Sequence, residues 1–160
     1  MSLTSLRTAR LRGGDWRAFC TDDLAALFAP DVVEFLPGGF QGLEVEGEQR
    51  SFLAKLSQQA SVVALCDVSG QGVGLLILSH VDQNTPERHL GYLFAQHVWG
   101  QGLATELVAA LQAQFRDANV TLCGGVMLGN TASARLLERA GFHGAETDGE
   151  VIYRWTGTGQ

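Results

Sequence analysis

Lysine is almost absent from this sequence: Lys55 is the only one among 160 residues, and the formal net charge is −6 at pH 7. The chain therefore lacks the basic stripe with which proteins bind a nucleic-acid backbone, and we expect no nucleic-acid partner. A phosphate group on a small ligand would have to be held locally, by backbone N–H groups and a few of the arginines.

Cysteines and long apolar runs are scarce as well. Cys20, Cys66 and Cys123 are odd in number and widely spaced, so they fit neither a disulfide framework nor a metal-binding motif. We expect buried free thiols and no metal. No apolar run approaches the roughly 20 residues that a membrane helix needs, and the N-terminus lacks the apolar core of a secretory signal. We expect one cytoplasmic domain over residues 1–160, without a membrane partner.

The first part of the chain predicts one strand followed by helices. Apolar spacing and breaking residues predict a strand over 4–11, helical turns over 16–28, a short helix over 31–36 and a helix over 48–59. Gly13 and Gly14 are expected to close the strand. Asp15 and Thr21 are the expected helix caps, and Pro30 is expected to interrupt the helical turns.

The apolar period then changes to that of strands. Runs over 61–68 and 73–81 are joined by residues 69–72, Ser-Gly-Gln-Gly, which predicts a hairpin. The later elements are expected to be a strand over 89–96, a helix over 103–115, a strand over 120–128, a helix from Asn130 to Ala140 stopped by Gly141, and a hairpin of 142–147 with 151–155. The order β-α-α-β-β-β-α-β-α-β predicts an α+β (mixed α/β) domain with one central sheet.

The most informative segment is the loop containing Gly100 and Gly102, which lies between an apolar run and the helical pattern of 103–115. A strand, a glycine loop and a helix N-terminus together predict an anion site, because the first-turn N–H groups lack helical partners and the helix dipole is positive there. The dinucleotide fingerprint does not fit, since Thr105 stands where a third Gly or Ala is needed, and no Lys-Ser or Lys-Thr follows for a phosphate-binding P-loop. A tight turn without a ligand is the alternative.

Two segments resemble the GCN5-related N-acetyltransferase (GNAT) superfamily. The loop from Trp99 to Ala104 is similar to the family's Gln/Arg-x-x-Gly-x-Gly/Ala pyrophosphate motif, and the segment from Asn130 to Phe142 resembles its Asn-x-x-Ser…Gly-Phe segment. The short segments at 90–92, 99–106 and 8–12 resemble the corresponding segments of the Rim-type branch, which acetylates the N-termini of ribosomal proteins. The resemblance implies a GNAT-like, mostly antiparallel sheet flanked by helices, with strands splayed around acetyl-CoA or coenzyme A as co-substrate.

The resemblance also implies a set of cofactor-binding residues. Phe94 and Ala95 would offer backbone groups to pantetheine. Asn130 would bind the cofactor arm, unless it only caps its helix. The pyrophosphate would be held by the loop and the first helical turn, that is by Trp99, Gly100, Gln101, Gly102, Leu103, Ala104 and Thr105. Trp99 stands where the family usually has Gln or Arg, which reduces side-chain help but leaves the backbone cradle.

The catalytic residues are less clear from the sequence. Many relatives carry a tyrosine seven residues after the Asn to protonate the departing thiolate, but Leu137 stands there. The resemblance offers Ser133 as the replacement and as a further cofactor contact, although it is alternatively a helix-backbonded serine. His89 occupies the slot of a family glutamate and is the expected general base, with Glu87 on the same strand face as the second choice. A purely structural histidine is the alternative.

The resemblance implies an acetyl-CoA-dependent N-acetyltransferase. A neutral primary amine, on a peptide N-terminus or a small molecule, would attack the thioester directly. If the acidic clusters at 44–48 and 146–150 flank the acceptor cleft, they would favour a cationic amine, but solvated turns are the simpler interpretation. The alternatives are a catalytically silent acyl-CoA-binding sensor or regulatory module and, less favoured, an enzyme with another acyl donor. The oligomeric state is left open between monomer and homodimer.

Overall fold

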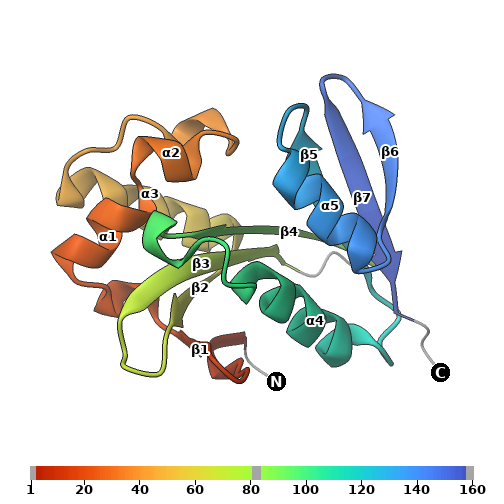
Figure 1. Ribbon diagram of the computed structural model, residues 1–160, viewed down its shortest axis with the longest axis horizontal. Coiled ribbons are helices and arrows are strands. Elements are labelled where there is room, and N and C mark those ends of the chain that lie inside the picture. Colours follow the sequence, from red (N-terminus) through yellow and green to blue (C-terminus); the bar gives the residue numbers. More distant parts are fainter. Residues whose placement is uncertain (1–2, 81–83, 158–160) are drawn as a thin grey trace.

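One sheet organises the protein (Figure 1). The computed structural model describes residues 3–80 and 84–157, in which the strand order is β1-β2-β3-β4-β5-β7-β6. The strands are β1 (Arg12–Gly14), β2 (Ala60–Cys66), β3 (Gly72–Ser79), β4 (Glu87–Phe94), β5 (Thr121–Met127), β6 (His143–Thr147) and β7 (Glu150–Thr156). Neighbouring strands are antiparallel except β4 and β5, which are parallel. The expected mixed α/β fold with a mostly antiparallel sheet is confirmed, as is the closing hairpin, whose two strands the expected order counts as one.

Helices cover both faces of the sheet (Figure 1). They are α1 (Thr21–Leu27), α2 (Pro30–Val33), α3 (Glu46–Gln59), α4 (Leu103–Phe115) and α5 (Thr131–Arg139), with 3₁₀ turns at Leu3–Ser5, Trp16–Ala18, Gly38–Phe40 and Gln96–Val98. Alternate residues of β2 divide between two cores. Val63 and Leu65 pack with the buried residues of α4, whereas Val62 and Ala64 pack with those of α1 and α3. Within the described ranges, no helix is long and apolar enough to cross a membrane.

The N-terminal segment differs from the prediction. Instead of a strand over 4–11, the chain forms a 3₁₀ turn and then turns back, so that β1 begins only at Arg12. Hydrogen bonds within the turn stabilise it: the N–H of Thr8 donates to the carbonyl of Leu11 at 3.0 Å, and the Thr8 hydroxyl accepts from the N–H of Leu11 at 3.0 Å. Gly13 pairs with β2 instead of closing a strand, and a Cβ there would lie 2.9 Å from the carbonyl oxygen of Leu3.

The first helices are shorter than expected, because capping residues divide them. Asp15 caps only the first 3₁₀ turn, by accepting from the N–H of Arg17 at 2.9 Å. The cap of α1 is Cys20, not Thr21, and its sulfur accepts from the N–H of Asp23 at 3.4 Å. Pro30 ends the helical turns as expected and is itself the first residue of α2, where a missing N–H does no harm. The helix α2 then ends at Val33 instead of residue 36, and α3 begins two residues early.

The second half agrees more closely with the sequence. The hairpin of β2 and β3 is confirmed, and the carboxylate of Asp67 closes it by accepting from the N–H groups of Ser69 and Gln71 at 2.9 and 3.0 Å. The expected end of the second strand, Val81, lies outside the described residues. The helix α4 begins and ends at the predicted residues, and Gly141 follows α5 with φ +93°.

The strands β4 and β5 diverge, and this divergence positions the site. Their pairing runs only from Glu87–Thr121 to Leu90–Gly124. Beyond these residues β4 pairs with β3 alone, up to Phe94, and β5 pairs with β7 alone, up to Met127. The expected splayed strands are therefore present.

Candidate functional site

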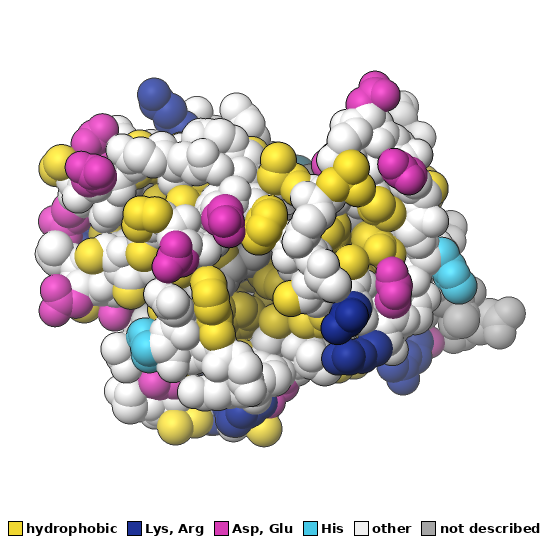
Figure 2. All heavy atoms as spheres, turned by 45° about the horizontal axis from the view of Figure 1, so that its top comes forward, with side chains coloured by type: hydrophobic (Ala, Val, Ile, Leu, Met, Phe, Trp, Pro, Cys, Tyr) yellow, Lys and Arg dark blue, Asp and Glu magenta, His cyan; other side chains and the backbone are white. Residues whose placement is uncertain are grey.

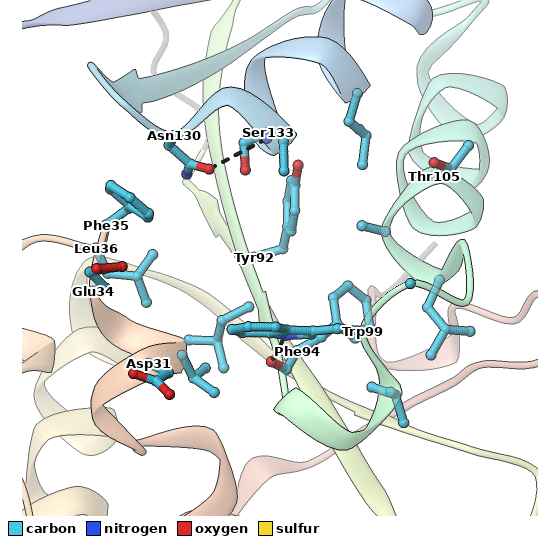
Figure 3. A pocket seen from close by; sticks show the side chains of 18 of the residues that line it. Asp31, Glu34, Phe35, Leu36, Tyr92, Phe94, Trp99, Thr105, Asn130 and Ser133 are labelled. Carbon is cyan, nitrogen blue, oxygen red and sulfur yellow. Dashed lines mark hydrogen bonds between the residues drawn. The ribbon is translucent and has the colours of Figure 1, made fainter.

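A cavity of about 600 Å³ lies where β4 and β5 diverge. Residues from α2, β4, the loop before α4 and the start of α5 line it (Figure 3), and Figure 2 shows apolar side chains gathered in a hollow. Most of the residues predicted to hold the cofactor meet there: Phe94, Trp99, Gly100, Gly102, Leu103, Ala104, Thr105, Asn130 and Ser133. Of the predicted set, Ala95 and Gln101 are not part of this lining.

The loop before α4 has the geometry of an anion site. Gly100 and Gly102 have φ +77° and +80°, a backbone conformation that other residues rarely adopt. Gly102 is the N-cap of α4, and no side chain caps it. The helical hydrogen bonds begin with the N–H of Glu106, which donates to Gly102 at 3.0 Å, so the preceding N–H groups of residues 103–105 have no partner within the helix. Residues 103–105 line the cavity, so these donors lie at the helix end where the dipole is positive.

Trp99 fastens the loop to the end of β4. Its indole Nε1 donates to the carbonyl of Phe94 at 2.8 Å. The N–H of Ala95 donates to the carbonyl of Val73 on β3 at 2.9 Å, so this amide faces away from the gap. Because backbone groups alternate along a strand, those of Tyr92 and Phe94 face the gap instead. The resemblance implied that both Phe94 and Ala95 bind pantetheine through their backbone. Because the Ala95 N–H already donates to Val73, the Phe94 N–H is the better placed donor.

Tyr92 is a residue that the sequence reasoning missed. Its hydroxyl is buried and has no hydrogen-bond partner among the described residues, although it lies beside Ser133 (Figure 3). Burial raises the pKa of the Tyr92 phenol, and the Ser133 hydroxyl offsets part of that rise. The phenol is therefore protonated at neutral pH and is a free donor toward the cavity that it lines. The alternation of side chains along β4 could predict the face on which the Tyr92 ring lies. The burial of its hydroxyl beside Ser133 depends on where α5 packs, which the local sequence does not reveal.

The start of α5 completes the opposite wall. Asn130 caps the helix, since its Oδ1 accepts from the N–H of Ser133 at 3.4 Å. Leu137, at the position where many relatives have tyrosine, is 2% exposed in the core and would lie 3.1 Å from a Cβ on Gly124. It offers no proton donor. The hydroxyls among the described lining residues are those of Tyr92, Thr105 and Ser133, and Figure 3 shows Tyr92 and Ser133 side by side with Thr105 apart on α4.

His89 and Glu87 lie on one strand face, as expected, but at the paired end of β4 and outside the lining of the cavity. One carboxylate oxygen of Glu87 accepts from the Cys123 thiol at 3.2 Å and from the Arg154 guanidinium at 3.3 Å, and both contacts lower the pKa of Glu87. Burial, together with the Glu87 carboxylate, raises the pKa of Cys123 to about 11.

The same three residues offer ligand atoms of the types that zinc prefers. The ligand atoms of Glu87, His89 and Cys123 lie within 4.8 Å of one another. The Arg154 guanidinium, however, already contacts the Glu87 carboxylate, and its positive charge competes with a metal ion. Hydrogen bonds and an ion pair thus account for the cluster.

The acidic segments at 44–48 and 146–150, for which solvated turns are the simpler interpretation, contribute no residue to the lining of this cavity. Glu46 accepts from the Thr21 hydroxyl at 2.7 Å and from Arg50 at 3.2 Å, which lowers the pKa of Glu46. In the main cavity the carboxylates among the described lining residues are instead Asp31 of α2 and Glu34, which directly follows that helix.

Comparison with known proteins identifies the family. A family model described as an acetyltransferase (GNAT) domain matches residues 16–143. The chain belongs to the GNAT acetyltransferase family. GNAT acetyltransferases use acetyl-CoA, and membership makes this protein an N-acetyltransferase of that kind. The comparison with curated proteins finds no match.

Solved structures share the GNAT fold over nearly the whole chain. The GNAT acetyltransferase from Bacillus anthracis is 20% identical, with 94% of this chain and 97% of that one covered and a TM-score of 0.73. RimL, a ribosomal L7/L12 alpha-N-protein acetyltransferase in complex with coenzyme A, is 15% identical, with 96% and 97% covered and a TM-score of 0.76. A GCN5-related N-acetyltransferase from Brucella melitensis is 16% identical, with 96% and 79% covered and a TM-score of 0.78. At these identities the likeness concerns the GNAT fold.

Proposed function

We propose that the protein transfers the acetyl group of acetyl-CoA to a primary amine that enters the cavity at the β4–β5 gap. One observation carries this proposal: the uncapped N-terminus of α4 and the gap between two diverging strands open into the same cavity. The first supplies donors for a diphosphate, and the second supplies backbone groups for an extended amide-containing chain.

The residues present fit such a ligand in three places. The N–H groups of the loop and first turn, Gly100 to Thr105, would hold the pyrophosphate. The backbone of Tyr92 and Phe94 would pair with the pantetheine arm. The side-chain NH₂ of Asn130, whose oxygen already caps α5, would hydrogen-bond the same arm.

The reaction then needs little further chemistry from the protein. The amine nitrogen bonds to the thioester carbonyl carbon, the carbon–sulfur bond breaks, and the thiolate takes up a proton. Ser133 is the donor proposed from the sequence, and the buried hydroxyl of Tyr92 beside it is a second. His89, or else Glu87, would take the proton from the amine through water, since neither lines the cavity.

The acceptor that we propose is a cationic amine, such as a peptide N-terminus or a polyamine. Asp31 of α2 and Glu34, which directly follows that helix, line the cavity, and Figure 3 shows both on the α2 side. Their negative charge would attract an ammonium group before it loses its proton. The Rim-type resemblance supports the peptide N-terminus.

The test is amine-dependent release of thiol from acetyl-CoA, measured over a panel of peptides, polyamines and aminoglycosides. Release with at least one amine supports transfer. Tight binding of coenzyme A without release for any amine would instead favour the silent acyl-CoA-binding module. A larger rise in melting temperature with succinyl-CoA than with acetyl-CoA would indicate another acyl donor.

A further inference from the structure

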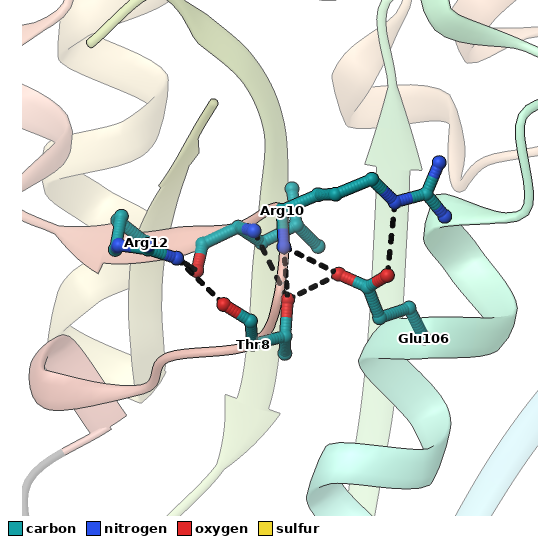
Figure 4. A network of polar contacts seen from close by, with 5 residues as sticks. Thr8, Arg10, Arg12 and Glu106 are labelled. Atoms are coloured by element: carbon teal, nitrogen blue, oxygen red, sulfur yellow. Dashed lines mark hydrogen bonds and ion pairs between the residues drawn. The ribbon is translucent and has the colours of Figure 1, made fainter. Parts of the chain in front are cut away.

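The N-terminal turn is fastened to the first turn of α4 (Figure 4). The carboxylate of Glu106 accepts from the hydroxyl of Thr8, from the N–H of Arg10 at 3.0 Å and from the Nε of Arg10 at 3.0 Å. These contacts join segments that lie almost 100 residues apart in the sequence. The hydrogen bond from Thr8 and then those from Arg10 hold the pKa of Glu106 below its ordinary value.

This arrangement places a cation at the mouth of the glycine loop. The Nε of Arg10 is taken by Glu106, and one terminal nitrogen, Nη2, lies 3.6 Å from the position that a Cβ on Gly102 would occupy. Gly102 is the N-cap of α4, next to the N–H groups that have no helical partner. The Arg10 side chain is 48% exposed, and within residues 3–80 and 84–157 no partner is found for its two terminal nitrogens.

The charge of Glu106 opposes anion binding at this helix end unless a cation balances it. A carboxylate in the first turn of α4 would repel a diphosphate at the same helix end, in a chain whose net charge is already −6. Its pairing with Arg10 neutralises the carboxylate and turns the guanidinium toward Gly102. A guanidinium is planar and always charged, and it donates two parallel hydrogen bonds to phosphate oxygens.

Building on the proposed function, we propose that Arg10 belongs to the acetyl-CoA site: its terminal nitrogens bind the pyrophosphate together with the loop amides, and Glu106 is the positioning residue that holds it there. The site therefore comprises two segments, the loop before α4 and the turn at 8–11. Their joining also explains why Thr8 and Arg10 are in a turn instead of the expected strand.

The experiment compares coenzyme A binding by the wild-type protein, Arg10→Gln and Arg7→Gln, using calorimetry. Arg7 is exposed on the same segment, so its variant loses the same charge three residues away. We expect Arg10→Gln to weaken binding about tenfold, in line with loss of a charge-assisted hydrogen bond, and Arg7→Gln to leave it unchanged. Equal affinity of wild type and Arg10→Gln would overturn the inference, and absence of wild-type binding would instead overturn the proposed function.

A truncated donor separates phosphate binding from a merely structural role. Acetyl-pantetheine carries the thioester and the amide arm but no pyrophosphate. If Arg10 binds the pyrophosphate, Arg10→Gln raises the KM for acetyl-CoA about tenfold and leaves the KM for acetyl-pantetheine unchanged. An equal rise for both donors would assign Arg10 to the fold alone. The ratio of the two KM values stays informative even if the variant melts at a lower temperature.

Discussion

The side-chain oxygen of Asn130 accepts the N–H of Ser133 at 3.4 Å, which leaves the side-chain NH₂ of Asn130 for the cavity that both residues line. The two roles suggested by the sequence, helix cap and cofactor contact, therefore use different atoms of one amide. A substitution that keeps the oxygen and removes the NH₂ can separate them.

Asn130→Asp is that substitution. Aspartate is as good an N-cap as asparagine, so we expect the melting temperature to be unchanged or slightly raised. Loss of the donor, with a negative charge in its place, should raise the KM for acetyl-CoA about tenfold. Steady-state kinetics and thermal melts measure both. An unchanged KM would reduce Asn130 to a helix cap.

Gly102→Val should abolish coenzyme A binding. The φ of +80° at this position is strained for valine, and the side chain would stand at the loop that receives the pyrophosphate. Gly149→Val is the matched control, because Gly149 has φ +78° and open space around it but lies in the hairpin of β6 and β7. Both variants should lose stability to a similar degree, while calorimetry should find binding only in the control. Wild-type affinity in Gly102→Val would remove the loop from the site.

Tyr92→Phe and Ser133→Ala test the two adjacent hydroxyls of the cavity. Each should lower kcat at least about tenfold with little change in the KM for acetyl-CoA, as expected when a proton donor to the leaving thiolate is lost. Phenylalanine keeps the ring packing of Tyr92 and removes only the unpartnered hydroxyl. A variant that turns over at the wild-type rate would identify the hydroxyl that the reaction does not need.

Glu106→Gln should reduce the free energy of unfolding at pH 7 by about 1 kcal/mol, the usual range for a partly exposed, charge-assisted contact. The folded-state pKa of Glu106 lies below its ordinary value of 4.5. Its contribution is therefore complete above about pH 4.5 and is lost as the pH falls through the lowered pKa. Denaturant unfolding at pH 7 and in steps below pH 4.5 should show the two proteins converging in acid.

Glu146→Gln is the control for this pH series. Glu146 is exposed on the edge strand β6, away from any helix N-terminus, so its variant should follow the wild-type protein across the whole range. If the free energies of unfolding of Glu106→Gln and wild type still differ below the lowered pKa, the difference does not come from the charged carboxylate of Glu106.

The parts of the fold that local chemistry determines could be predicted from the sequence. The hairpin at 69–72 and the bounds of α4 follow from turn residues and apolar spacing within a short window. The geometry of the loop at 99–105 could be predicted because its glycines and the following helix are adjacent in the chain. These features do not depend on distant contacts.

The features that the sequence did not predict depend on contacts between distant segments. The turn at 8–11 forms where Thr8 meets Glu106, 98 residues away. The place where β4 and β5 separate, just after Leu90, decides that His89 lies outside the cavity, and no local pattern marks it. Asp31 and Glu34 face the cavity because α2 packs over the end of β4, which an acidic count along the chain does not reveal.

The short pairing of β4 with β5 has a consequence for local opening of the sheet. Four residue pairs between β4 and β5 connect β5, β7 and β6 to the rest of the sheet. A ligand bound between β4 and β5 would therefore add contacts that hold these two parts of the sheet together. Amide hydrogens near Val126 and Met127 should then exchange with solvent more slowly when the ligand is bound. A ligand concentration of about 100 times the dissociation constant should raise the free energy of unfolding by about 2.7 kcal/mol.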